Sequence, residues 1–342
     1  MADETPKTNG HKVNGHKLPG LSPLFGATGG KATGAESLPF DFEATQRALT
    51  PVHAEIPRDA FTAGMLGTTR AGGGMVIGSG NLILTIGYLI VEAESVAVTD
   101  SKGRPVEAEV IAYDFESGFG LVRAATSLGR PLLNFGTARD LTVGSTVVAS
   151  CGGAETVVQR LVDKRGFTGY WEYRLDEAIY TVPAHPNWGG SALIGMDGLL
   201  YGVGSLYVED AQPGEEKSVG NMFVPIDLLE PVLDDLLVHG RRSTPARPWV
   251  GVYAAERMGH LVLMGVAARG PAATAGLDQG DIILRVGATA IGSLDEFYTA
   301  LWNFGEAGCT LPLTLMRDGR VFETSVQTAD RDSFLKIPRW NR

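Results

Sequence analysis

The chain has 342 residues, enough for two or three domains of ordinary size. Hydrophobic residues make up 44% and charged residues 20%, while 45 glycines and 18 prolines predict many turns and exclude a long helical bundle. Acidic residues outnumber basic ones by 39 to 29, and the net charge of −10 argues against nonspecific nucleic-acid binding as the main activity.

No apolar run reaches the roughly 18 residues that a membrane-spanning helix needs. The polar opening MADETPKTNGHKVNGHK has no apolar stretch typical of a signal peptide. We therefore expect a cytoplasmic protein that does not span a membrane. Cys151 and Cys309 are too few for a disulfide framework or a cysteine zinc site, and two small buried thiols are expected. No metal or cofactor is expected either. His11 and His16, in the near-repeat NGHKVNGHKL, are favoured as solvated side chains, with loose metal binding as the alternative. The other histidines lack ligand spacing such as His-x-x-x-His: His53, His185, His239 and His260.

In chain order, residues 1–45 are polar and rich in Gly, Lys and Thr, which predicts a disordered N-terminal tail. Residues 46–240 hold short apolar runs bounded by Gly, Asp, Ser and Asn, a pattern typical of many short strands in barrels or a sandwich. A helix with apolar residues at helical spacing should end at Gly240. The basic, proline-bearing residues 241–248 suit a linker.

A second, smaller domain is expected over residues 249–331. It has strand-like runs, a helix that begins after the candidate N-cap Ser293, and a hairpin turn at Asp318-Gly319. Residues 332–342 are left as a C-terminal tail.

Three segments of the larger domain carry a family resemblance. The first is LTIGYLI, which contains Tyr88, the second is DFESGFGLV around Gly118, and the third is PNWGG, which contains Pro186 and Trp188. Together they resemble the trypsin-like protease domain of the HtrA/Deg family, and GPAATAGLDQGDIILRVG in the smaller domain resembles that family's PDZ domain. The resemblance covers about residues 57–331. It implies a mainly β chain with a chymotrypsin/trypsin-like double β-barrel followed by an HtrA-type PDZ domain.

The resemblance also implies that the catalytic positions are degenerate. Tyr88, Gly118 and Trp188 stand where the family has its catalytic His, Asp and Ser. Indole offers no nucleophilic lone pair, a phenol is protonated near neutral pH, and glycine has no side chain. The family's oxyanion hole uses a backbone N–H at the position of Pro186, and proline has none. We therefore expect no catalytic residues and a pseudoprotease.

Alternatives remain at this site. A displaced pair of Ser191 and His185 would give a serine hydrolase with relocated catalytic residues, although an ordinary strand serine and a surface-loop histidine are favoured. Trp188 would either fill a former active-site cleft or form the aromatic floor of a ligand pocket.

PDZ domains bind extended peptides at a sheet edge and hold the terminal carboxylate with successive backbone N–H groups. By resemblance, that loop is Trp249, Val250, Gly251 and Val252, and a strand beginning at Val252 and Tyr253 would line the groove. Phe297 and Leu301, four residues apart on the predicted helix, would face the peptide from the other side, with a position in the domain core as the alternative.

The leading hypothesis is therefore a catalytically inactive HtrA-like protein that binds a peptide or protein partner as an adaptor, chaperone-like or scaffold factor. A structural subunit of a larger hetero-complex, with both tails as docking segments, is an alternative. Relatives form trimers through aromatic residues near the start of the protease domain, so Phe40, Phe42 and Phe61 are candidates for a homo-trimer contact, with ordinary core packing as the competing interpretation.

Overall fold

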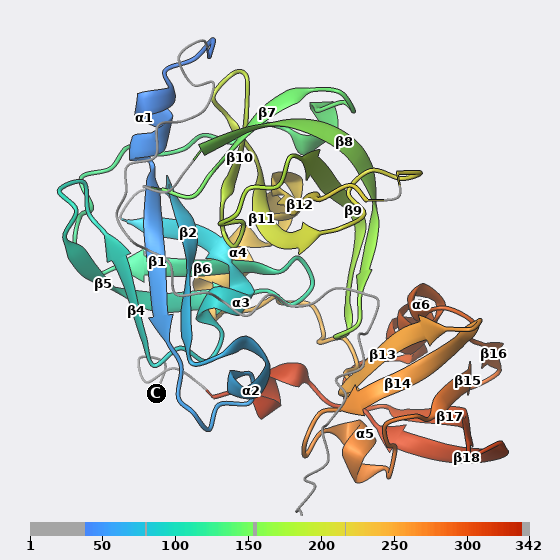
Figure 1. The fold of residues 1–342 in the computed structure, drawn as a ribbon. Coiled ribbons are helices and arrows are strands. Elements are labelled where there is room, and N and C mark those ends of the chain that lie inside the picture. Colours follow the sequence, from blue (N-terminus) through green and yellow to red (C-terminus); the bar gives the residue numbers. More distant parts are fainter. Residues whose placement is uncertain (1–37, 79–80, 153–155, 216, 337–342) are drawn as a thin grey trace, which may run out of the picture.

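A computed structural model describes residues 38–78, 81–152, 156–215 and 217–336 of the chain. Two closed β-barrels are followed by a smaller β-domain (Figure 1). The fold is mainly β, as predicted. Most of the predicted N-terminal tail, with His11 and His16, lies outside the described residues, as do residues 337–342 of the C-terminal tail.

The first barrel closes in the strand order β1-β2-β3-β6-β5-β4. Alternate residues of β5 are buried, because successive side chains of a strand point to opposite faces. Its elements are α1 (Phe42–Arg47), β1 (Leu49–Glu55), α2 (Ala63–Leu66), β2 (Thr69–Gly78), β3 (Leu82–Ile86), α3 (Gly87–Ile90), β4 (Ser95–Thr99), β5 (Pro105–Tyr113) and β6 (Phe119–Ala124).

The second barrel closes in the order β10-β11-β12-β9-β8-β7. Its strands β8 and β9, of 14 and 10 residues, form a long hairpin that extends out of the barrel toward the smaller domain (Figure 1). The elements are η2 (Ala138–Asp140), β7 (Thr146–Ser150), β8 (Thr156–Gly169), β9 (Tyr173–Val182), β10 (Ala192–Gly195), β11 (Leu200–Val208), β12 (Gly220–Pro225), η3 (Ile226–Leu228) and α4 (Glu230–His239).

The smaller domain is a sheet in the order β13-β14-β15-β17-β18, with β16 paired to β15. Its elements are β13 (Val252–Arg257), β14 (His260–Val266), α5 (Pro271–Thr274), β15 (Ile282–Val286), β16 (Thr289–Ala290), α6 (Leu294–Phe304), β17 (Thr310–Arg317), β18 (Arg320–Gln327) and the 3-10 helix η4 (Arg331–Phe334).

Local signals in the sequence correctly predict several element ends. Gly240 ends α4 with a left-handed φ of 70°. Ser293 begins α6 in a capping box with Glu296, in which each side chain accepts a backbone N–H of the other residue. Asp318 and Gly319, both with positive φ, form the β17–β18 turn.

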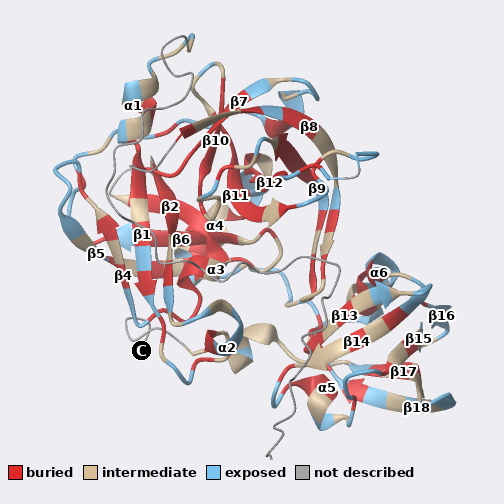
Figure 2. Ribbon diagram, in the orientation of Figure 1, coloured by how far each residue is buried: buried red, intermediate tan, exposed pale blue. Residues whose placement is uncertain are grey.

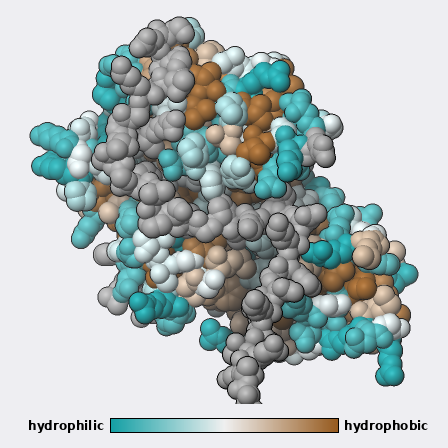
Figure 3. Space-filling model, viewed as in Figure 1, coloured by the Kyte–Doolittle hydropathy of each residue, from teal (hydrophilic) through white to brown (hydrophobic). Residues whose placement is uncertain are grey.

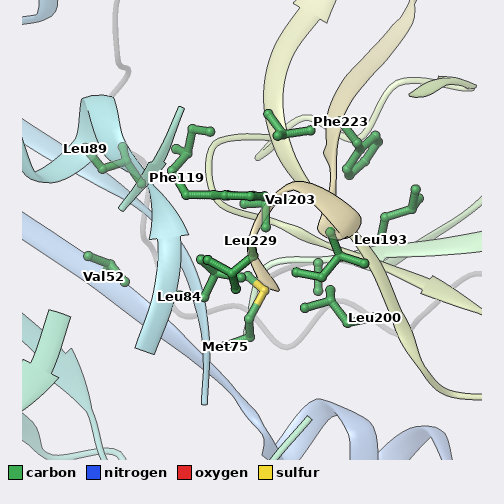
Figure 4. Packing of buried hydrophobic residues seen from close by; sticks show 14 of the residues in the cluster. Val52, Met75, Leu84, Leu89, Phe119, Leu193, Leu200, Val203, Phe223 and Leu229 are labelled. Carbon is green, nitrogen blue, oxygen red and sulfur yellow. The ribbon is translucent and has the colours of Figure 1, made fainter. Parts of the chain in front are cut away.

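Two separate hydrophobic clusters stabilise the chain. One spans both barrels and includes residues from each, such as Leu84 and Phe119 from the first and Leu193 and Phe223 from the second (Figure 4). The other lies inside the smaller domain. Buried residues follow the strands of both units, while exposed ones concentrate at turns and strand ends (Figure 2). On the face shown in Figure 3, hydrophilic residues cover much of the surface outside the grey segments.

The described part of the C-terminal tail contacts the rest of the chain. The chain returns from the smaller domain to the first barrel, where the Lys336 backbone N–H donates to the Glu92 carboxylate at 2.9 Å. The Lys336 ammonium pairs with Asp59 at 2.5 Å. Phe334 lies with its ring centroid 4.9 Å from that of Trp249. Within the described ranges, no helix is long and apolar enough to cross a membrane.

Candidate functional site

Tyr88 lies on the short helix α3 and connects the two barrels. Its hydroxyl donates to the backbone carbonyl of Ser205 in the second barrel at 2.9 Å. Burial, followed by the neighbouring Cys151, raises the pKa of the Tyr88 phenol above its ordinary value, and a hydrogen bond from the Trp188 side chain acts in the opposite direction. Tyr88 is therefore a protonated donor at neutral pH, and its hydroxyl is used to hold the barrels together.

Gly118 lies immediately before β6 and next to α3, since its carbonyl accepts the Gly87 backbone N–H at 2.7 Å. Its φ is +87°, a conformation that L side chains rarely adopt, and a Cβ added there would lie 2.9 Å from the Tyr173 hydroxyl oxygen. That hydroxyl donates to the Ser117 carbonyl at 2.7 Å. An aromatic side chain from the second barrel thus takes the space beside Gly118.

Trp188 lies in the loop before β10, with its ring 5.6 Å from that of Tyr207. Its backbone carbonyl accepts the Ser191 hydroxyl at 2.8 Å. The following Gly189 approaches Tyr88 so closely that an added Cβ would lie 2.7 Å from the Tyr88 hydroxyl. Tyr88, Gly118 and Trp188 are therefore brought together between the barrels, and Pro186, which has no N–H, is exposed at the start of the same loop.

Ser191 and His185 are both fully buried, at 0% exposure. The prediction that His185 lies on the surface is therefore wrong. The Nδ1 atom of His185 accepts the Asn187 backbone N–H at 3.0 Å, and its own backbone N–H donates to Asn221 at 2.5 Å. These contacts shape the 185–188 loop, and the Ser191 hydroxyl is directed to the carbonyl of Trp188.

A cavity of about 110 Å³ adjoins Tyr88 and Gly118. Aromatic side chains from both barrels and from β13 of the smaller domain line it, along with Arg331 of the C-terminal segment: Phe61, Tyr113, Phe115, Trp171, Tyr173 and Tyr253. The nearby Cys151 is buried, which raises the pKa of its thiol to about 12 and keeps it protonated, as expected for a structural cysteine. In the described ranges, no group of three or more His, Cys, Asp or Glu side chains could hold a metal ion.

The loop that the resemblance assigns to peptide binding is occupied by a residue of the second barrel. Glu172, at the tip of the β8–β9 hairpin, accepts three consecutive backbone N–H groups: Val250 at 3.2 Å, Gly251 at 2.7 Å and Val252 at 3.0 Å. Glu172 is only 6% exposed. Burial raises the pKa of its carboxyl to about 7, against the lowering effect of these donors and of Arg331. Four consecutive polar and aromatic residues, YWEY, between two strand-like runs were the only sequence signal for this tip.

The structure corrects the predicted orientation of Phe297 and Leu301. Both are 0% exposed and belong to the hydrophobic cluster of the smaller domain. The helix residues that contact the hairpin are Tyr298, whose hydroxyl donates to the Gly169 carbonyl at 2.8 Å, and Asp295, which accepts from Arg174 at 2.5 Å. Trp249 also points elsewhere, toward Phe61 and Phe334.

The candidate trimer residues have intramolecular partners. Phe61 packs on Trp249 with 5.9 Å between ring centroids, and Phe40 packs on Phe42 with 6.1 Å.

Comparisons with known proteins agree with this architecture. Residues 72–203 match the trypsin-like peptidase domain, and residues 242–328 match the PDZ domain. Among solved structures, the HtrA-type protease AlgW with a decapeptide has a TM-score of 0.51, 18% identity, and coverage of 86% of this chain and 98% of that one. The serine endoprotease from Yersinia pestis has a TM-score of 0.50, 21% identity, and coverage of 86% and 99%.

The fold is therefore of the HtrA type.

Curated relatives with this HtrA-type fold are named proteases. The serine endoprotease DegS of Salmonella typhimurium is 24% identical over 280 residues, which cover 75% of this chain and 76% of that protein. The serine protease PepD of Mycobacterium tuberculosis is 27% identical over 271 residues, which cover 72% and 58%. The PDZ domain of the present chain indicates peptide or protein binding.

Proposed function

We propose that this HtrA-type chain is a pseudoprotease that acts by binding a peptide or protein through its PDZ domain. The observation that carries this proposal is the set of residues between the barrels: Tyr88, Gly118 and Trp188 at the positions of base, acid and nucleophile. Acyl transfer needs an attacking oxygen or sulfur, a base of near-neutral pKa and a group that orients the base. None of these three residues supplies the group that its position requires.

The surroundings of these residues support the same conclusion. The Tyr88 hydroxyl is used in a bond between barrels, and the space for a side chain at residue 118 is taken by Tyr173. Pro186 removes one donor of an oxyanion hole, whose loss alone costs about 10²- to 10³-fold in rate. Although its relatives are named proteases, this chain has lost more than a single catalytic group.

The described contacts give little support to a hydrolase with relocated catalytic residues. The Ser191 hydroxyl donates to the Trp188 carbonyl rather than to a base. The Cys151 thiol is buried and protonated. We therefore assign the double barrel the role of a scaffold that carries the PDZ domain, in an adaptor or chaperone-like factor or in a larger hetero-complex.

Labelling with a serine-directed fluorophosphonate tests the absence of a nucleophile. We expect no covalent adduct on the folded protein and no casein cleavage, with an active HtrA protease labelled in parallel as the positive control. The Ser191→Ala variant should behave identically to the wild type. Stoichiometric labelling of any serine, or casein turnover that Ser191→Ala abolishes, would contradict the proposal.

A further inference from the structure

The β8–β9 hairpin contacts the PDZ domain at the places where a bound peptide would make its contacts. The backbone N–H of Ala254, on the edge strand β13, donates to the Tyr170 carbonyl at 3.2 Å. On the opposite side, the Tyr298 hydroxyl of helix α6 donates to the Gly169 carbonyl and accepts the Glu172 backbone N–H, both at 2.8 Å. The hairpin tip thus lies between the strand and the helix that form a PDZ groove.

Glu172 supplies the carboxyl group that the terminus of a bound peptide normally provides. Its carboxyl group accepts the N–H groups of Val250, Gly251 and Val252, which are successive backbone donors at the start of β13 and immediately before it. Such an arrangement of backbone N–H groups is an anion-binding site. Glu172 also has a φ of 58°, a left-handed conformation that is unfavourable for a non-glycine residue. The contacts with the loop offset this cost.

Polar pairs hold the strand residues next to the hairpin tip against α6. Arg174 forms an ion pair with Asp295 at 2.5 Å, and the Thr168 hydroxyl lies 3.4 Å from the same carboxylate. Contacts on both strands of the hairpin fix the position of its tip.

We propose that the β8–β9 hairpin is an internal ligand of the PDZ domain, in which the Glu172 side chain replaces the carboxyl terminus of a peptide and closes the groove until the hairpin withdraws. This inference rests on the proposed function, since it assumes that the PDZ domain binds peptides. The external ligand that fits is an extended peptide with a free carboxyl terminus, because the three N–H groups of the loop receive a single carboxyl group.

Competition with the docked hairpin weakens the apparent affinity of the PDZ domain for a free peptide. A peptide binds only the fraction of molecules whose groove is open, so its apparent dissociation constant rises by the inverse of that fraction. Removal of the Glu172 carboxyl group should therefore tighten peptide binding, by about tenfold for each 1.4 kcal/mol of docking free energy lost.

The experiment compares three full-length proteins: the wild type, Glu172→Ala, and the control Glu177→Ala, which removes an exposed carboxylate from the same hairpin. An array of decapeptides with free carboxyl ends, and the same array with amidated ends, identifies binders. Fluorescence anisotropy with the best decapeptide then gives dissociation constants. We expect Glu172→Ala to bind about tenfold or more tightly than the other two proteins, and the amidated decapeptide to bind none of them. Circular dichroism melting checks that the variants fold.

A second measurement needs no ligand. Hydrogen exchange followed by mass spectrometry should show faster exchange of the 250–252 amides in Glu172→Ala than in Glu177→Ala, because three hydrogen bonds are lost. Unchanged exchange, or equal peptide affinity in all three proteins, would overturn the internal-ligand proposal. Faster exchange without binding of any decapeptide would instead overturn peptide binding by the PDZ domain. The proposal that the hairpin closes the groove against peptides would then fall as well, while the contact between the hairpin and the PDZ domain would stand.

Discussion

Single residues at the three positions that the sequence aligns with a catalytic triad have structural roles. Tyr88 connects the barrels through the Ser205 carbonyl, and Gly118 allows a backbone conformation and a close approach that other residues do not tolerate well. Tyr173, whose hydroxyl lies beside Gly118, is 6% exposed and stacks on Trp171 with an interplanar angle of 7°. These contacts leave the Tyr173 ring little room to move, so a new side chain at residue 118 would have to displace packed atoms.

Substitution of Gly118 measures how much a side chain at this position destabilises the domain. We expect Gly118→Ala to lower the free energy of unfolding of the peptidase domain by about 1–2 kcal/mol for the left-handed backbone plus about 1–3 kcal/mol for the contact with Tyr173. Gly144→Ala is a matched control, because Gly144 has a φ of +96° and an added Cβ would meet nothing within 4 Å. Urea denaturation followed by circular dichroism gives both values.

The double variant Gly118→Ala/Tyr173→Phe separates the two costs. It removes the hydroxyl that the new methyl group would meet, so the two substitutions should be non-additive, with the double variant less destabilised than the sum. Equal destabilisation by Gly118→Ala and Gly144→Ala would contradict the steric argument.

Among the elements, helix α6 and the β8–β9 hairpin together decide what the PDZ groove holds. A spacing of four residues correctly places Phe297 and Leu301 on one face of α6, but that face is directed into the domain core. Tyr298 and Asp295 face the hairpin instead. Which face of α6 enters the domain core depends on the elements that cover the helix. One of these elements is the β8–β9 hairpin of the second barrel.

Docking of the hairpin should depend on pH. Burial raises the pKa of Glu172 from 4.5 to about 7 in the docked state, so that state holds the proton more tightly than the undocked one. The charged and titratable groups that face the carboxyl group are Arg331, Tyr253 and Tyr298. Docking should therefore be strongest below the free value of 4.5, weaken as the pH rises toward 7, and change little above it.

Protection factors of the 250–252 amides, corrected for intrinsic exchange, measure this dependence between about pH 5 and about pH 8. Glu172→Gln is the control, because its amide does not titrate and its protection should be independent of pH in this range. Protection that increases with pH in the wild type would show that the three N–H donors outweigh burial and would contradict the expected sign.

At the scale of the whole molecule, the PDZ domain is attached to the first barrel as well as to the hairpin. Arg242 of the 241–248 segment binds the buried Asp114 through two hydrogen bonds of 2.8 and 2.7 Å. The C-terminal segment adds a cluster of three rings, in which Phe334 lies 4.9 Å from Trp249 and 6.4 Å from Phe61. The two ends of the PDZ domain are thus both held against the barrels.

Loss of the Phe334 ring should loosen this attachment. We expect Phe334→Ala to weaken the contact by about 1–2 kcal/mol, because a partly buried aromatic ring and its aromatic contacts are removed. Trypsin should then cleave the 241–248 segment after Arg241 or Arg242 about five- to thirtyfold faster. Phe304→Ala is the control, since Phe304 is 42% exposed. Equal cleavage rates in the two variants would show that the ring cluster does not hold the domain.

The sequence by itself determined the architecture and the three residues that align with a catalytic triad. Alternating apolar runs, turn residues and helix caps are local signals, and the segments around Tyr88, Gly118 and Trp188 can be aligned without knowledge of what surrounds them. Only the tertiary structure decided that Tyr173 fills the space beside Gly118, that His185 is buried, and that Glu172 occupies the PDZ loop. These contacts join residues far apart in the chain, such as Glu172 and Gly251, and no local pattern encodes which distant residue closes a given cavity or groove.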